Sequence, residues 1–248
     1  MKKTLLLFVS YLFLSSICMP LSAQHFIIGV QDAGYFPLYD FPKNSHTKEL
    51  LDAFAKSKGY KFTYLSLPLK RINYWYQEEA IDFRYPDNIM WKKGRDFYSK
   101  LTFSDPVVEL VSGTMVRKGD EGKKREEIKT IGTLLGFHAT MWTDLIASGN
   151  TKLVEITSVL SIVKQVLHGH LDATNLEQSV VKHYLKVLDK EGELIVDKTL
   201  PHEVYTYQLS TIKFEHVILE FNLFLKENKS FVEQLRRKYH ITDTTNYL

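Results

Sequence analysis

Segments that read as short strands alternate along most of this chain with segments whose apolar residues recur at helical spacing. The first, at residues 26–30 (FIIGV), is an apolar run typical of a buried strand, and further strand candidates lie at residues 62–66, 81–85, 130–135, 171–174 and 194–196. The helical segments lie at residues 46–58, 68–79, 140–147, 158–168, 180–188, 214–225 and 230–239. This alternation predicts an α/β fold in which mostly parallel sheets are flanked by helices.

The alternation has two halves of similar size. A long β-branched stretch at residues 107–116, with a glycine in it, ends the first half, and a charged loop at residues 118–129 precedes the second. Two α/β runs of this size predict two lobes, and a cleft between lobes is a common place for a ligand.

The first 23 residues have the pattern of a secretory signal peptide. Lys2 and Lys3 precede an apolar run at residues 5–14, and Leu21-Ser22-Ala23 supplies the small residues that a signal peptidase requires. We therefore predict cleavage after Ala23. The alternative, an uncleaved membrane anchor, is disfavoured because the apolar run is short for crossing a bilayer.

The composition of the expected mature chain excludes several classes of protein. Cleavage would leave 225 residues (248 − 23), would remove the only cysteine, Cys18, and would lower the net charge to +1 (30 − 29). Without cysteine there is no disulfide framework and no Cys-rich zinc or iron–sulfur site. A near-neutral charge argues against nucleic acid as a partner. We expect a soluble periplasmic monomer.

Six short motifs follow one another in a characteristic order. They are IIGV with YFPLY near the start, LPLKR at 67–71, IDFRYP at 81–86, FSDPVV at 103–108, TIGTLLGFHAT at 130–140 and HGHLDAT at 168–174. In this order they resemble the bacterial extracellular solute-binding proteins of family 3, which have the type II periplasmic-binding fold typical of amino-acid receptors. The resemblance extends from Phe26 to about Ile241.

The resemblance implies two interleaved lobes. Lobe one would comprise residues 24–112 plus 203–248, and lobe two residues 113–202. Two crossover strands, near Ser112-Gly113 and near His202-Glu203, would form the hinge between them. Gly113 suits a hinge that absorbs backbone rotation, and the lobes would close over a ligand by a hinge motion.

Two arginines are candidates for holding a ligand carboxylate, because the guanidinium fork pairs with both carboxylate oxygens. Arg95 is the best positional match to the family arginine with this role, and Arg71 follows the second expected strand. The alternatives are a surface arginine in a Lys/Arg-containing loop for Arg95 and a solvated residue in the first turn of a helix for Arg71.

Aromatic residues on expected loops at strand ends are further candidates, because the carboxyl ends of strands face the ligand crevice in α/β sheets. They could stack on an apolar ligand body or on a cation, although core packing is the alternative for each one. These residues are Tyr35, Phe36, Tyr85, Trp91 and Trp142. Thr140 could offer a hydroxyl and a backbone N–H to an anion, or act only as a helix cap.

Glu177 follows the LDAT sequence by three positions. The resemblance implies a carboxylate here that holds the ligand amine, whereas the alternative is an exposed acid in the first turn of a helix. His168 and His170 lie in a turn without the further ligands that a metal requires, so we expect no metal site and no cofactor. Nucleotide-binding and hydrolase motifs are absent from the sequence.

The leading hypothesis is a periplasmic binding protein, not an enzyme, that captures an amino acid or a related carboxylate. Its partner would be an ABC permease or a membrane sensor. A second hypothesis is a periplasmic dehydratase of cyclohexadienyl acids on the same fold, with Glu177 as general acid. A third is a ligand-free partner of a membrane sensor.

Overall fold

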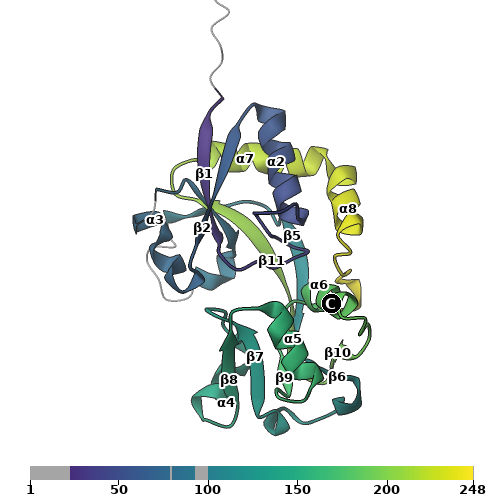
Figure 1. Cartoon of the computed structure of the whole chain (residues 1–248). Coiled ribbons are helices and arrows are strands. Elements are labelled where there is room, and N and C mark those ends of the chain that lie inside the picture. The colour runs from purple at the N-terminus through teal and green to yellow at the C-terminus, as the bar shows by residue number, and fades with distance from the viewer. Residues whose placement is uncertain (1–22, 79, 93–99, 248) are drawn as a thin grey trace, which may run out of the picture.

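The computed structural model describes residues 23–78, 80–92 and 100–247, and its strands form two separate sheets (Figure 1). The first sheet has the order β2-β1-β3-β11-β4, and β5 also pairs with β11. Its strands are β1 (His25–Gln31), β2 (Lys61–Leu67), β3 (Phe83–Asp87), β4 (Thr102–Phe103), β5 (Val108–Gly113) and β11 (His202–Thr211). The second sheet has the order β10-β6-β9-β7-β8. Its strands are β6 (Met115–Arg117), β7 (Thr130–Leu134), β8 (Lys152–Ile156), β9 (Ala173–Thr174) and β10 (Leu194–Val196).

Each sheet has a parallel part and an antiparallel part. β1 is parallel to β2 and β3, and β7 is parallel to β8 and β9. The antiparallel pairs all involve β11 in the first sheet and β6 in the second. The expected α/β architecture with two lobes is therefore confirmed, but the sheets are mixed. In the first sheet β11 runs against β3, β4 and β5, and in the second sheet β6 runs against β9 and β10.

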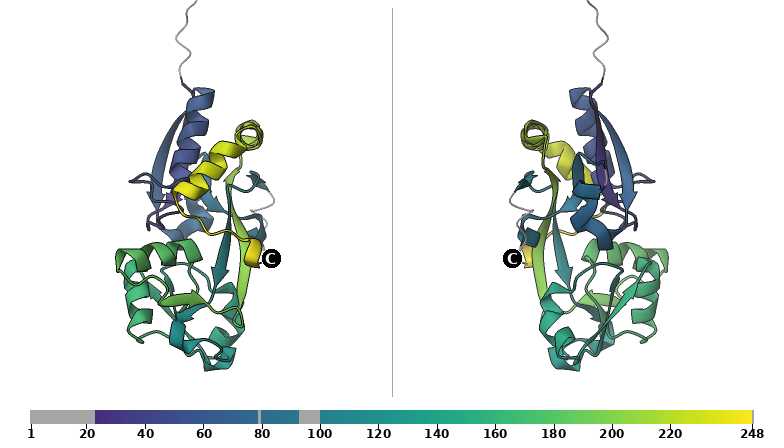
Figure 2. Two further views of the ribbon diagram at one scale, coloured as in Figure 1. Left: turned by 90° about the vertical axis from the view of Figure 1, so that its right-hand side faces the viewer. Right: turned by 90° about the vertical axis from the view of Figure 1, so that its left-hand side faces the viewer.

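Helices cover each of the two sheets, and each sheet with its helices forms a separate body, as the side views also show (Figure 2). We call the body built on the first sheet lobe one and the body built on the second sheet lobe two. The helices of lobe one are α2 (His46–Lys58), α3 (Trp75–Glu78), α7 (Glu215–Glu227) and α8 (Lys229–Lys238). Those of lobe two are α4 (Thr143–Ala147), α5 (Val159–Leu167) and α6 (Gln178–Val187). No described helix is both long and apolar enough to cross a membrane.

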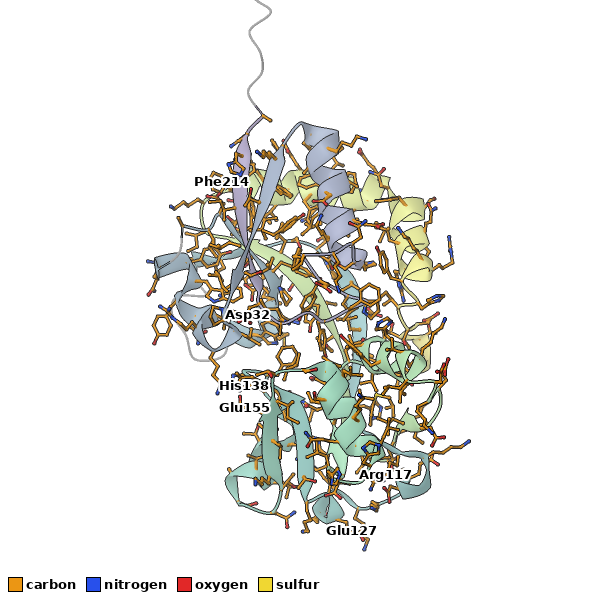
Figure 3. The ribbon with its side chains drawn as sticks, viewed as in Figure 1. Asp32, Arg117, Glu127, His138, Glu155 and Phe214 are labelled. Atoms are coloured by element: carbon orange, nitrogen blue, oxygen red, sulfur yellow. The ribbon has the colours of Figure 1, made fainter. Side chains whose placement is uncertain are left out.

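Aromatic rings form the centre of lobe one. Phe26 on β1 is 1% exposed, and its ring lies 5.3 Å from that of Phe83 and 5.0 Å from that of Phe214 (Figure 3). Phe54 of α2 meets Phe221 of α7 at 5.0 Å. Burying a ring of this size contributes about 2–3 kcal/mol, so this cluster fixes the helices against the sheet.

The two crossover strands lie side by side along the long axis of the molecule (Figure 1). β5 and β11 pair antiparallel from Val108↔Tyr207 to Gly113↔His202. β6 begins at Met115, two residues after β5 ends, so the chain passes directly from one sheet to the other. Gly113 is required here by close packing, because a Cβ atom on it would lie 2.7 Å from Cγ1 of Val196.

Several expected elements differ from the observed ones. The helix expected at 68–79 is a 3₁₀ turn, η1 (Leu69–Tyr74), followed by the short α3. The third expected strand, at 81–85, is β3 (Phe83–Asp87), which extends past the expected end and includes Pro86. The pairing with β11 shifts register opposite Tyr85 and Pro86, and such a bulge tolerates a residue that has no N–H.

Two other differences concern elements later in the chain. The last expected helix, at 230–239, is α8, which begins at Lys229 and has Asn228 as its N-cap residue. Ser158 does cap α5, accepting a hydrogen bond from the N–H of Ser161 at 3.4 Å. Residue patterning did not indicate β4, β8 or β11, although the family resemblance implied a crossover strand near His202-Glu203, where β11 begins.

A buried ion pair stands at the end of β3. Arg84 and Asp87 are both fully buried, and Nε of Arg84 donates to Oδ2 of Asp87 at 2.8 Å. Ser210 of β11 donates to the same oxygen at 2.5 Å, and the N–H of Asn88 donates to the other at 2.8 Å. Burial nevertheless raises the pKa of Asp87, with the Arg84 charge opposing the shift. The pair ties β3 to β11 beside the crossover.

Candidate functional site between the lobes

The carboxyl ends of the parallel strands of both sheets face one another. Asp32 follows β1, and His138 follows β7; Figure 3 shows them at facing edges of the two lobes, with Glu155 of β8 close to His138. In open α/β sheets this edge is where ligands bind. We therefore take the junction between these edges as the candidate site.

Direct contacts join the lobes at this junction. Nζ of Lys70, on η1 of lobe one, lies 3.1 Å from Oε2 of Glu155. Oε1 of Glu155 accepts the N–H of Gly136 at 2.9 Å. Gly136 has φ +90°, and a Cβ atom on it would lie 3.2 Å from the backbone N of Lys70. The turn after β7 thus needs glycine both for its backbone conformation and for the close approach of lobe one.

Glu177 is the N-cap residue of α6, and it is 1% exposed. Its Oε2 accepts the N–H of Val180 at 3.0 Å, and its Oε1 accepts the hydroxyl of Ser179 at 3.0 Å. Its own backbone N–H donates to the hydroxyl of Tyr35, from lobe one, at 2.8 Å. Glu177 also forms an isolated antiparallel bridge with Ser112 of β5. The backbone of Glu177 therefore contacts both Tyr35 of lobe one and the crossover strand β5, whereas its carboxyl group bonds the first turn of α6.

The environment of Glu177 is apolar enough to change its protonation. Burial raises its pKa from 4.5 to about 7, against the smaller lowering effect of its hydrogen bonds to Ser179 and Val180. The hydroxyls of Tyr205 and Tyr207, on β11, lie 3.4 Å apart. Burial raises the pKa of Tyr205, and the nearby Glu177 charge adds to the increase. The site therefore holds one carboxyl group that can be neutral or ionised near neutral pH, among neutral phenols.

Of the residues singled out in the sequence, the structure brings Tyr35 and Glu177 together. The ring of Tyr35 is 5.3 Å from that of Phe137, so this contact also joins the lobes. The ring of Trp91 lies 6.2 Å from that of Tyr207 on β11, and Trp91 is 38% exposed.

The other candidates lie elsewhere. Tyr85 and Trp142 are completely buried. The hydroxyl of Tyr85 bonds that of Thr47 at 2.8 Å, and Nε1 of Trp142 donates to Oγ1 of Thr114 at 3.1 Å. Both therefore pack in lobe cores, as the alternative interpretation had it. Phe36 packs against His183 on the far side of α6, at 4.4 Å between ring centroids.

Three candidates remain to be placed. Arg71 is exposed on η1, next to Lys70 of the lobe contact. Thr140 is exposed in the segment after β7, and its hydroxyl bonds the carboxylate of Glu203. Burial raises the pKa of Glu203, and the bond from Thr140 only partly opposes this increase. Arg95 lies outside the described residues, as does the expected signal peptide apart from Ala23. Within the described part of the chain, no group of three His, Cys, Asp or Glu side chains could hold a metal ion.

Sequence reasoning missed four residues of the junction. They are Lys70, Phe137, Glu155 and Tyr205. Lys70 and Phe137 stand inside motifs that were recognised, so a closer look at those motifs could have found them. Glu155 and Tyr205 lie on β8 and β11, and no expected strand carried them.

Comparison with known proteins supports the fold. No family model matches the chain, and no curated protein matches its sequence. Among solved structures, an ancestral arginine-binding protein bound to arginine has a TM-score of 0.67 at 18% identity, over 87% of this chain and 97% of that one. The GluR0 ligand-binding core from Nostoc punctiforme, in complex with L-glutamate, has a TM-score of 0.67 at 13% identity, over 86% and 98%. The ancestral amino acid-binding protein AncCDT-1, a precursor of cyclohexadienyl dehydratase, has a TM-score of 0.66 at 19% identity, over 87% and 95%.

These likenesses cover nearly the whole of each known structure. Together with the two mixed sheets and the paired crossover strands, they establish that this chain has the two-lobed type II periplasmic-binding-protein fold. A fold of this kind accommodates more than one function, so function must be argued from the site itself.

Proposed function

We propose that this chain is a periplasmic solute-binding protein of family 3 that captures an amino acid, or a related amine-bearing carboxylate, between its lobes. Lobe one would comprise residues 24–112 and 203–248, and lobe two residues 113–202. The observation that carries the proposal is the position of Glu177. It caps α6 at the base of the hinge, at the position where the family resemblance implies an amine-binding carboxylate.

The hydrogen bonds of the Glu177 carboxylate leave acceptor positions for a ligand. An ionised carboxylate has about four acceptor positions, and Ser179 and Val180 occupy two of them. A ligand ammonium group would take a further position through a charge-assisted bond. Because Glu177 is only 1% exposed, this bond requires the lobes to separate first and then to close over the ligand.

The remaining contacts follow from the same junction. The exposed part of Trp91 would lie against the ligand body. Arg71, and Arg95 by the family resemblance, would hold the ligand carboxylate through the guanidinium fork. Thr140 would add a hydroxyl from lobe two. Tyr85 and Trp142 are left out of the proposed site because they are completely buried.

A ligand-linked thermal shift tests the proposal. Purified protein would be heated with each of the common amino acids, with small peptides and with organic acids. We expect at least one compound to raise Tm, because a ligand that binds only the folded state stabilises it. Glu177→Gln should remove most of the shift, whereas Glu121→Gln, at an exposed position, should keep it. The absence of a shift with every compound would contradict the proposal, and co-purification with a receptor ectodomain would then favour a ligand-free sensor partner.

The raised pKa of Glu177 supports a second candidate function, a dehydratase of cyclohexadienyl acids. A general acid works best when its pKa lies near the working pH, and burial raises the pKa of this carboxyl to about 7. The assay is product formation from arogenate or prephenate. Activity that is abolished in Glu177→Gln would favour the enzyme, and the absence of product from both substrates would remove this candidate. A permease or a membrane sensor remains the proposed partner of a binding protein.

A further inference from the structure

A cavity lies against α6, lined by residues of this helix and of the C-terminal segment. Its volume is about 640 Å³, within the range of small-molecule sites. One wall comes from α6, β6 and β10 of lobe two, and the other from Phe36, Pro37 and the segment from Lys238 to Tyr247. Figure 1 shows α6, β10, the end of α8 and the C-terminus grouped on this side of the molecule.

The floor of the cavity is apolar. Met115, Leu185 and Leu194 line it and are at most 3% exposed. The rings of Phe36 and Tyr239 also line it, and they pack edge to face against each other at 6.0 Å between centroids. A floor of this kind suits an aliphatic or aromatic ligand body rather than a small inorganic ion.

One buried polar group in the lining lacks a full set of partners. Gln178 is 5% exposed, and its Nε2 donates to the hydroxyl of Tyr247 at 2.8 Å, but its Oε1 has no hydrogen-bond partner. Turning the amide over exchanges its two atoms and still leaves one without a partner. A buried amide atom in this state is rare and costly, and a ligand group in the cavity would satisfy it.

The charged groups of the lining are mainly cationic. Lys182, Lys186 and Lys238 line the cavity, against the single acid Glu191. Lys238 is already paired with Glu49 at 2.7 Å. Partial burial lowers the pKa of Lys182, so an anion beside it would replace lost hydration. The rim therefore favours a ligand with negative charge.

The outer wall is held in place by the C-terminal segment. The N–H of Thr242 donates to Oγ of Ser179 at 2.8 Å, and Thr244 bonds Glu109 of β5. With the bond between Gln178 and Tyr247, these contacts fasten the segment across the hinge. The outer wall of the cavity is thus fixed by hydrogen bonds to lobe two and to the crossover strand β5.

We propose that this cavity is a second ligand site, which takes a small organic anion with an apolar or aromatic body and a hydrogen-bonding group that reaches Gln178. Its walls belong to both lobes, so an occupant contacts both and biases their opening. The cavity adjoins Glu177 through Ser179, which lines it and donates to the Glu177 carboxyl, but its lining contains Gln178 and lysines in place of a buried amine-binding acid, so its ligand needs no amine.

Methyl NMR on methionine-labelled protein tests this site directly. The described methionines are Met90, Met115 and Met141, and among them Met115 lines the cavity. The probe is 4-hydroxyphenylacetate, which has an aromatic body, a hydroxyl and a carboxylate. Tyramine, which has the same ring and hydroxyl but carries a cation, is the matched control. We expect a saturable shift of the Met115 methyl with the anion, a much weaker one with tyramine, and no change at Met141.

Variants locate the binding. Gln178→Leu and Lys182→Gln should each raise the dissociation constant of the probe about tenfold, as expected for the loss of one hydrogen bond or charge contact. Lys226→Gln, on an exposed face of α7, should bind as wild type does. Unchanged Met90 and Met141 signals confirm folding, and if Gln178→Leu fails to fold, Lys182→Gln decides.

Three results would overturn the proposal. One is a Met115 methyl that does not move up to about 10 mM probe, ten times a weak dissociation constant of 1 mM. Another is an equal response to tyramine. The third is binding that both cavity variants leave intact, which would place the probe elsewhere. None of these results affects amino-acid binding at Glu177, so the two proposals fail separately.

Discussion

The buried carboxyl of Glu177 makes the stability of this protein depend on pH in a direction opposite to that of most acids. Its pKa is raised from 4.5 in an ordinary environment to about 7 in the folded chain. Between these values the folded protein keeps a proton that the unfolded chain has lost. Stability should therefore fall as pH rises through this window, stay constant above it, and carry no penalty below pH 4.5.

The magnitude follows from the size of the shift. The pKa of Glu177 differs by about 2.5 (7 − 4.5) between the folded and the unfolded chain. A pKa difference of 1 corresponds to about 1.4 kcal/mol, so the free energy of unfolding should fall by about 3 kcal/mol across the window. Replacing Glu177 by Gln removes the titration and keeps a neutral side chain of the same shape. The variant should therefore gain stability relative to wild type as pH rises, by about 3 kcal/mol between pH 4.5 and pH 7.

Urea unfolding of both proteins at half-unit steps from pH 4.5 to pH 8 measures this difference. Taking the difference between the two proteins cancels the contribution of every other titrating group. Glu121→Gln, at an exposed position, is the control and should track wild type at each pH. A difference that does not vary with pH, or one in which wild type gains on Glu177→Gln as pH rises, would refute the view that this carboxyl is desolvated at the hinge.

Three further predictions follow from the same structure. Gly136→Ala and Gly59→Ala both place a side chain at positive φ, and each should lower the free energy of unfolding by on the order of 1 kcal/mol. Only Gly136→Ala should also lower the affinity for the ligand in the cleft, because its Cβ would lie 3.2 Å from the backbone N of Lys70. Equal ligand affinities in the two variants would show that this lobe contact is irrelevant to closure. Trp142→Ala should lower the free energy of unfolding by about 3–5 kcal/mol, and Trp91→Ala, at a partly exposed position, by less than about 1 kcal/mol, as chemical denaturation would measure. The affinity for an amine ligand should increase by up to about tenfold for each pH unit as the pH is raised toward 7, and it should level off above pH 7, because the ammonium group prefers ionised Glu177. Calorimetric affinities that do not change over this range would contradict a contact with Glu177.

Part of the fold could be predicted from the sequence because several strands are largely buried. The segment FIIGV of β1 reads as a continuous apolar run for this reason. β11 was missed for the opposite reason. Its sequence HEVYTYQLST mixes polar and aromatic residues, because its first half crosses between lobes and is only partly buried. Only the family resemblance pointed to a crossover near its start, at His202-Glu203.

The candidate site was predicted in part. The position of Glu177 after the LDAT motif indicated a carboxyl at the start of a helix, and the structure places it as the N-cap residue. Its burial could not be predicted, because it depends on Tyr35, which is 142 residues away in sequence, and on β11. Likewise, Arg84 within an apolar run gave no sign that it pairs with Asp87 in the interior.

Native mass spectrometry of the protein isolated from the organism that makes it tests the central claim most directly, because a binding protein that closes over its ligand retains it. The proposal predicts a one-to-one complex with a small molecule that carries both an amine and an acid group. The complex should be retained by Glu121→Gln and lost from Glu177→Gln. Wild-type protein that is free of any small molecule, or an identical complex in wild type and Glu177→Gln, would contradict the assignment of Glu177 as the residue that holds the ligand.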